Sequence, residues 1–232
     1  MGERGRYAGV SVAAVVLLVL GVATWKRGSV YADSQTLWRD NVAKNPNAWV
    51  AHNYLGCDLS RDGGIHEAIA HYEQALRIKP DYVDAHNNLG NALMEVGRIQ
   101  DAMGHYEQAL RIDPAYATAH YNLGVALAQA GELQSARAHF EQAVRIEPDY
   151  AEAHNNLGTA LLIAGRVPEA INHYEQALRL KPDSPEVHCN LARALEQTGN
   201  VKEARAQYEE ALRIKPESVE AQRGLAQLRA VQ

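Results

Sequence analysis

Asparagine side chains recur in this sequence at two adjacent positions of a 34-residue spacing. The longer series is Asn88, Asn122, Asn156 and Asn190, and the series one residue earlier is Asn53, Asn87 and Asn155. A carboxamide carries both a hydrogen-bond donor and an acceptor, as does each unit of a peptide backbone. A row of such side chains along one surface would therefore suit an extended polypeptide. The alternative is that each asparagine only bonds a neighbouring helix.

Histidines recur with the same spacing. Five stand at one place of the repeat (His52, His86, His120, His154 and His188), and four at a second place (His71, His105, His139 and His173). Zinc needs ligand nitrogens near 2 Å from one centre, whereas equivalent residues of successive repeats are separated by a whole repeat, roughly 10 Å. We predict no metal site and no cofactor, and we expect these histidines to pack and to form hydrogen bonds.

The elements that position these residues follow from the periodic prolines at 46, 80, 114, 148, 182 and 216, each 34 residues after the last. Within each block, Leu-small-x-x-Leu, as in Leu157-Gly158 to Leu161, marks one stripe of a first helix. A glycine such as Gly165 ends that helix. Alanines seven apart with a ring between them, as in Ala170, Tyr174 and Ala177, predict a closely packed second helix, which the proline stops.

With these residues the chain resembles the tetratricopeptide repeat (TPR) family. The resemblance covers five repeats, at 49–82, 83–116, 117–150, 151–184 and 185–218. It implies an all-α, right-handed TPR superhelical solenoid. Two departures from the family pattern are His at the fourth place, where Trp is common, and Leu at the eleventh, where Tyr is common. Both can pack on a helix face.

The stretches H-N-N-L-G and H-Y-N-L-G resemble the TPR region of O-linked N-acetylglucosamine transferases, where such an asparagine ladder holds substrate polypeptide. The first helices of a TPR stack line its concave groove. The resemblance therefore implies a peptide-binding groove formed by Asn53, Asn87, Asn88, Asn91, Tyr121, Asn122, Asn155, Asn156 and Asn190. Further groove-facing candidates are Val125, Thr159, Leu162, Ile163 and Arg193.

Residues 7–25 form a charge-free, mainly apolar run after a short segment at 1–6. At about 1.5 Å per residue such a run reaches roughly 28 Å, close to the hydrocarbon thickness of a bilayer. We predict an N-terminal transmembrane helix, and the alternative is a cleaved signal peptide ending near Gly21-Val22-Ala23. Charges flank both ends, so the positive-inside rule leaves the orientation open.

Residues 26–48 read as a juxtamembrane linker and a partial TPR helix, in which Trp38 takes the place of the periodic ring. The junction over residues 8–56, which includes the stretch from Tyr31 to Arg39, is similar to that of multi-span membrane glycosyltransferases that resemble protein O-mannosyltransferases and carry C-terminal TPR tails outside the cytoplasm. This resemblance implies an extracytoplasmic TPR region and an alternative function, a non-catalytic tail that presents protein substrate.

The formal net charge is −5, and acidic and basic residues interleave, so we expect no nucleic-acid partner. No nucleophile elbow, phosphate loop or dinucleotide fingerprint is present, so we predict no catalytic residue and no small-molecule substrate. Residues 219–232 read as a polar capping helix. The sequence favours a single-pass, membrane-anchored scaffold for a peptide or protein partner, while self-assembly through an exposed end repeat stays open.

Overall fold

The structure is a computed structural model that describes residues 33–230. The segments predicted at 1–6 and 7–25, including the transmembrane helix or signal peptide, lie outside these residues. Among residues 33–230, no helix is long and apolar enough to cross a membrane. The described chain contains only helices, joined by short turns, as expected of an all-α repeat protein.

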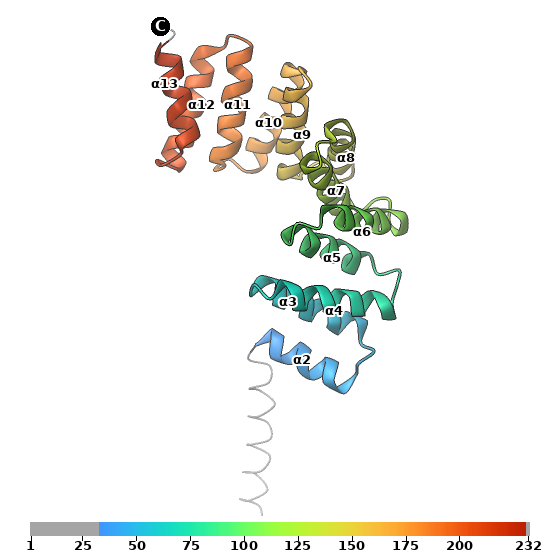
Figure 1. The fold of residues 1–232 in the computed structure, drawn as a ribbon. Helices are drawn as coiled ribbons and strands as arrows, with labels where there is room; N and C mark the ends of the chain where they lie inside the picture. The colour runs from blue at the N-terminus through green and yellow to red at the C-terminus, as the bar shows by residue number, and fades with distance from the viewer. Residues whose placement is uncertain (1–32, 231–232) are drawn as a thin grey trace, which may run out of the picture. The chain divides into compact units, whose positions relative to one another are not determined.

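The helices alternate between the first and second helix of each repeat (Figure 1). The first helices are α3 (Trp49–Arg61), α5 (Val83–Glu95), α7 (Ala117–Gln129), α9 (Ala151–Ile163) and α11 (Pro185–Gln197). The second helices are α4 (Ile65–Ile78), α6 (Ile99–Ile112), α8 (Leu133–Ile146), α10 (Val167–Leu180) and α12 (Val201–Ile214). Before them lies α2 (Ser34–Lys44), and after them α13 (Val219–Ala230).

The described residues form two compact units, which divide between Ala92 and Leu93, within α5. In the first unit, α2 packs on α3 and α3 packs on α4. In the second unit, each of α7, α9 and α11 packs on the helix that follows it, and each of α8, α10 and α12 packs on the first helix of the next pair. Within each unit these helices bury their apolar stripes against sequence neighbours, as expected of stacked hairpins.

The core consists of the residues that recur every 34 positions. In the fourth repeat, Leu157 and Leu161 are each 2% exposed, and the ring of Tyr174 is fully buried between Ala170 and Ala177. The alanines let the two helices of a hairpin approach closely, and the ring fills the space between them. The predicted division into small and large core positions is confirmed.

The hairpin turn depends on a left-handed glycine, as the sequence predicts. Gly165 has φ of 75°, its N–H bonds to the Leu162 carbonyl at 3.0 Å, and the next N–H, of Arg166, bonds to the Leu161 carbonyl at 2.9 Å. Gly63, Gly97, Gly131 and Gly199 share the positive φ. A side chain at these positions would strain the backbone, so glycine is required there.

The small residue at the eighth place lies under the periodic ring. A Cβ added to Gly158 would stand 2.8 Å from a carbon of Tyr174. In the fifth repeat this residue is Ala192, and the ring of Tyr208 lies against Gly224 of α13, where an added Cβ would stand 2.3 Å from it. The fifth repeat thus has alanine at the eighth place and a glycine on the next helix, where the ring comes close.

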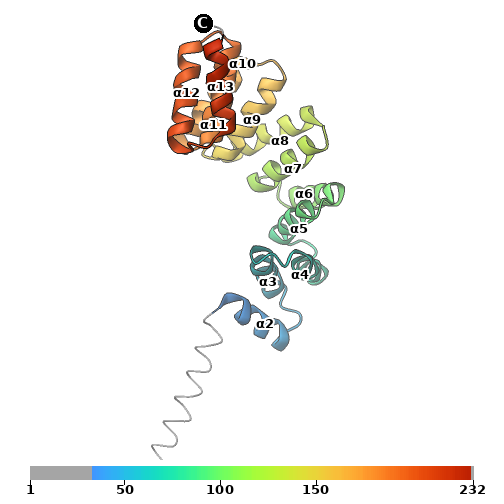
Figure 2. The same ribbon diagram turned by 60° about the vertical axis from the view of Figure 1, so that its left-hand side comes forward.

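Helix α13 packs on α12 and α11 at the end of the second unit (Figure 2), where the sequence predicts a capping helix. Ala221 and Leu228 are buried against the preceding hairpin, whereas Arg223 and Gln227 are exposed. Gln222 holds the place that histidine holds in the repeats, and its Nε2 donates to the Pro216 carbonyl at 2.9 Å. The cap therefore retains the proline contact of a repeat while presenting a polar outer face.

Candidate functional site

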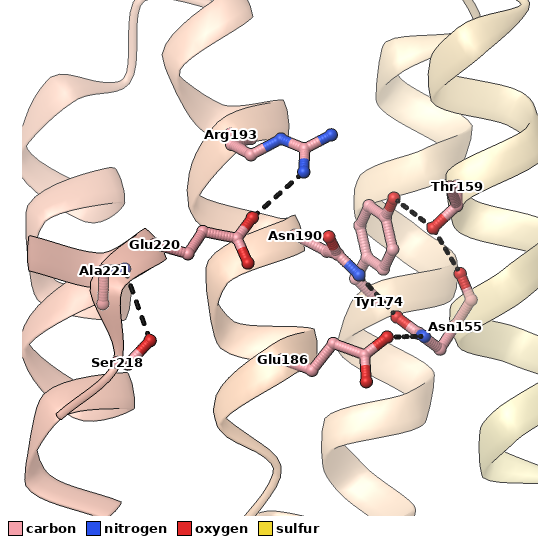
Figure 3. Close-up of polar contacts among 9 residues, drawn as sticks. All are labelled: Asn155, Thr159, Tyr174, Glu186, Asn190, Arg193, Ser218, Glu220 and Ala221. Carbon is pink, nitrogen blue, oxygen red and sulfur yellow. Dashed lines mark hydrogen bonds and ion pairs between the residues drawn. The ribbon is translucent and has the colours of Figure 1, made fainter. Parts of the chain in front are cut away.

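The asparagines at the fifth place are buried and hydrogen-bonded between helices. Asn155 on α9 is 8% exposed; its Oδ1 accepts from Nδ2 of Asn190 on α11 at 3.0 Å (Figure 3). Its own Nδ2 donates to Oε1 of Glu186 at 3.3 Å. This carboxamide joins two successive first helices, so its first task is to hold the repeats together.

The first unit repeats this arrangement. Oδ1 of Asn53 on α3 accepts from Nδ2 of Asn88 on α5 at 3.1 Å, and Nδ2 of Asn53 donates to the Tyr82 hydroxyl at 3.4 Å. Asn53 is 3% exposed and Asn87 is 4% exposed. The alternative left open by the sequence, in which asparagine bonds a neighbouring helix, therefore describes Asn53 and Asn155.

The asparagines at the sixth place are more accessible. Asn88, Asn122 and Asn156 are half-buried, although Asn190 is buried, and Asn91 at the ninth place is exposed. Nδ2 of Asn156 donates to the hydroxyl of Tyr121 at 3.3 Å.

Both N–H groups of Asn88 have acceptors, Asn53 and the Cys57 sulfur, which leaves its Oδ1 as the group available to a ligand. The predicted row is therefore two rows. Asn53 and Asn155 join helices, and Asn88 keeps an accessible Oδ1, whereas Oδ1 of Asn156 accepts from Nδ2 of Asn155 at 3.4 Å.

An apolar pocket adjoins this row in the second unit. It lies between α7, α8 and α9, with walls of Val125, Leu133, Phe140 and Ile163 and with Asn156 on its lining. Ile163 is 60% exposed and Leu133 is 39% exposed, which is unusual for large aliphatic side chains. Apolar walls with a few polar groups are typical of pockets that bind ligands.

The second residue of α9, α11 and α13 is a glutamate in each case. Glu152 forms an ion pair with Lys181, and that hydrogen bond lowers the pKa of Glu152 below its usual value. Glu220 pairs with Arg193 at 3.1 Å, and Glu186 accepts from Asn155 (Figure 3). Thr159, another predicted groove residue, accepts from the Tyr174 hydroxyl at 3.1 Å and donates to the Asn155 carbonyl.

In the first unit the sixth-place row begins with an aromatic side chain. Tyr54 is 47% exposed and stacks on Trp38 of α2, with ring centroids 4.9 Å apart. Nearby, Tyr82 meets Trp49 edge-on, and burial raises the pKa of Tyr82 to about 12. This confirms Trp38 as a packing residue, but Tyr54 was missed as a candidate because it breaks the asparagine pattern.

Sequence reasoning also missed a set of histidine pairs. Within one repeat, the histidine at the fourth place meets the histidine at the twenty-third. The Nδ1 atoms are 2.9 Å apart in His52–His71, 3.0 Å apart in His120–His139, and 2.9 Å apart in His154–His173. The recurring separation of 19 residues was the available signal. Comparing equivalent places of different repeats hid it, because the partners belong to one hairpin.

The other nitrogen of each fourth-place histidine faces a proline carbonyl. Nε2 lies 3.1 Å from the Pro46 carbonyl oxygen in the first repeat and 3.0 Å from that of Pro148 in the fourth. Among residues 33–230, no group of three or more histidine, cysteine or carboxylate side chains is arranged to hold a metal ion. The histidines thus link the two helices of a hairpin to the turn before it.

The helix pairs, the left-handed glycines and the ring over the small residue define a tetratricopeptide repeat protein. The chain belongs to the family described as the cilia and flagella-associated protein 70 C-terminal domain, which matches residues 10–232. None of the curated proteins compared with the chain matches it.

Solved TPR structures share the fold. PilF of Pseudomonas aeruginosa aligns with a TM-score of 0.77 and 20% identity, covering 94% of this chain and 99% of its own. YrrB, described as a TPR protein with an unusual peptide-binding site, aligns with a TM-score of 0.66 and 20% identity over 80% of this chain and 96% of its own. MamA aligns with a TM-score of 0.63 and 27% identity over 70% of this chain and 95% of its own.

Proposed function

We propose that this protein is a non-catalytic scaffold that binds an extended segment of a partner polypeptide on the face formed by its first helices. The observation that carries the proposal is the apolar pocket between α7, α8 and α9, which adjoins the half-buried Asn156. An apolar side chain of the ligand would enter the pocket, while its backbone meets the sixth-place amides.

The polar groups of this face favour a ligand that supplies donors. In the second unit, Glu152 and Glu186 place carboxylates on the lining of a pocket beside α9, and Glu152 already pairs with Lys181, a basic side chain. Backbone N–H groups and cationic side chains are the donors that such oxygens bind. We therefore expect a strand with aliphatic and basic residues rather than an acidic one.

Rigidity supports the same proposal. Asn155 and Asn190 fix the spacing of α9 and α11 before any ligand binds, and both side chains are 8% exposed. A preformed surface loses little conformational entropy on binding, so more of the contact energy remains as affinity.

Membrane attachment is a further part of the proposal. The apolar residues 7–25 would anchor the scaffold as a single-pass protein, with the repeats on the extracytoplasmic side. The extracytoplasmic placement rests on the similarity of residues 8–56 to glycosyltransferase tails, and it stays a prediction.

The binding test uses the full-length chain and an array of extended peptides that vary in aliphatic and basic content. We expect Ile163→Asp to weaken capture at least tenfold, because one charge in an apolar pocket costs more than about 1.4 kcal/mol. Replacing Asn122 and Asn156 together with Ala should also weaken it. Ile163 is largely exposed, so its replacement should leave the helical circular dichroism unchanged.

The matched control is Glu175→Ala, on the exposed face of the second helix α10. This variant should bind as the parent does. Unchanged capture by Ile163→Asp and by the double asparagine variant would contradict the proposed groove, and weakened capture by Glu175→Ala would place the binding face on the second helices.

A further inference from the structure

The histidine pairs have their protons fixed by their surroundings. A carbonyl oxygen can only accept, so Nε2 of each fourth-place histidine, which lies 3.2 Å from the Pro114 carbonyl in the third repeat, must carry a proton. In the neutral ring Nδ1 then has a lone pair. The facing Nδ1 of His139, 3.0 Å from Nδ1 of His120, must therefore be the donor.

This arrangement accepts one additional proton but not two. The first can enter at Nε2 of His139, and the Nδ1–H donated to His120 is retained. The second could enter only at Nδ1 of His120, which would remove the acceptor and set two N–H groups and two positive charges against each other at 3.0 Å. In the unfolded chain each histidine binds its own proton near its ordinary pKa of about 6.5.

We propose that these pairs are an acid-sensitive device: the folded pair takes up one proton where the unfolded chain takes up two, so a fall in pH weakens the packing of the first helix on the second. His52–His71, His120–His139 and His154–His173 share the geometry in the first, third and fourth repeats. The fifth repeat replaces the second histidine with Gln207, which meets Nδ1 of His188 at 2.6 Å and cannot titrate. This repeat is an internal control.

The charged neighbours differ among the pairs. Glu67 of α4 raises the pKa of His71, and Arg39 of α2 lowers it. These two side chains form an ion pair with each other at 3.2 Å. Glu169 raises the pKa of His173 and Arg166 lowers it. Arg137 of α8 lowers the pKa of Glu169. For His139 the charge that acts is that of His120. The third repeat therefore gives the cleanest test.

The direction of the pH dependence follows from linkage. Burial lowers the pKa of His71, His139 and His173, and the facing histidine lowers it further. A lowered pKa means that the unfolded chain binds more protons, so stability is present above about pH 6.5 and is lost as the pH falls below it. With one proton of difference per pair, the folding equilibrium constant falls by a factor approaching tenfold per pH unit for each pair.

The experiment measures the folding constant of the full-length chain by urea unfolding between pH 7.5 and 5.0, for the parent and for His139→Gln. Carboxylates titrate alike in both proteins, so their effect cancels in the ratio. We expect the ratio of parent to variant to be flat above pH 6.5 and to fall, approaching tenfold per unit, below it. Gln207→His should add a further pair and deepen the loss of stability at low pH, so that the ratio of parent to this variant rises as the pH falls below 6.5. A ratio that does not change with pH would overturn the proposal.

Imidazole nitrogen NMR of the parent gives a second test that needs no variant. At pH 7.5 we expect protons on Nε2 of His120 and on Nδ1 of His139, with a single protonation of the pair above pH 5. Two independent protonations near pH 6.5 in the folded protein would overturn the device, whatever the peptide-binding experiments show.

Discussion

At the scale of single residues, neighbouring asparagines of one helix have different tasks. Asn155 is buried, accepts from Asn190 and donates to Glu186, whereas the next residue, Asn156, is half-buried and donates to Tyr121. A buried polar group that loses its partner costs more free energy than an accessible one, because water cannot replace the bond. Burial, rather than residue type, therefore separates the structural amides from those that can bind a ligand.

The first prediction compares these two asparagines. Asn155→Ala should lower the free energy of unfolding by about 1–3 kcal/mol, because Nδ2 of the buried Asn190 loses its acceptor. Asn156→Ala should cost only about 0.5–1.5 kcal/mol, the net value of one hydrogen bond. Urea unfolding at pH 7.5 measures both. If both variants lose the same free energy of unfolding, the buried Asn155 contributes no more to stability than Asn156 does.

At the scale of the helix pair, the ring and the small residue beneath it set the distance between the two helices. Gly56, Gly124 and Gly158 lie so close to their rings that an added Cβ would stand 2.6–2.8 Å from the nearest ring carbon. The fifth repeat has Ala192 at this place, and there the ring of Tyr208 lies against Gly224 of the next helix. The periodic ring therefore lies close to a glycine, either on the first helix of its own repeat or on the helix that follows.

The second prediction concerns Gly158. Replacement with Ala should destabilise the protein by about 1–3 kcal/mol, because the ring of Tyr174 must move within a closely packed core. Gly104 is the matched control, since it lies within α6 and an added Cβ meets nothing within 4 Å. Gly104→Ala should stabilise the helix by about 0.4–1 kcal/mol. Thermal unfolding distinguishes them, and destabilisation by both would refute the role of the ring.

The third prediction concerns the cap. Leu228 is 6% exposed on α13. Leu228→Ala should lower the free energy of unfolding by about 2–5 kcal/mol through the cavity that it leaves. Leu225, half-buried one turn earlier, should cost less when replaced in the same way. Hydrogen exchange of α11 and α12 is the measurement. If their protection is unchanged in Leu228→Ala, α13 is not needed to cover the last hairpin.

At the scale of the whole molecule, membrane attachment is the property that residues outside the described chain would provide. The described residues hold no helix that could span a bilayer. The apolar residues 7–25 carry the hypothesis alone, and it has two forms, a retained anchor or a signal peptide that is removed.

The fourth prediction separates these forms. If residues 7–25 are an anchor, the full-length chain should stay in the membrane pellet after an alkaline wash, and deletion of 7–25 should release it. Mass spectrometry of the mature protein provides the control. A chain that begins after Ala23 and is found in the wash would support the signal peptide and exclude the anchor.

The sequence alone determined the number of helix pairs, their turns and their core positions. Each of these depends on local rules: a left-handed residue requires glycine at Gly165, and helical periodicity places Leu157 and Leu161 on one stripe. Because helices within each unit pack on their sequence neighbours, local rules suffice for this part of the fold.

Only the tertiary structure decided which polar side chains form hydrogen bonds within the protein and which stay accessible to a ligand. Asn53 and Asn88 lie 35 positions apart, and His120 and His139 lie 19 apart, yet each pair is within hydrogen-bond distance. Such contacts depend on how helices rotate against each other, and a one-dimensional pattern does not contain that rotation. The asparagine row was therefore visible in the sequence, but its division into structural and accessible amides was not.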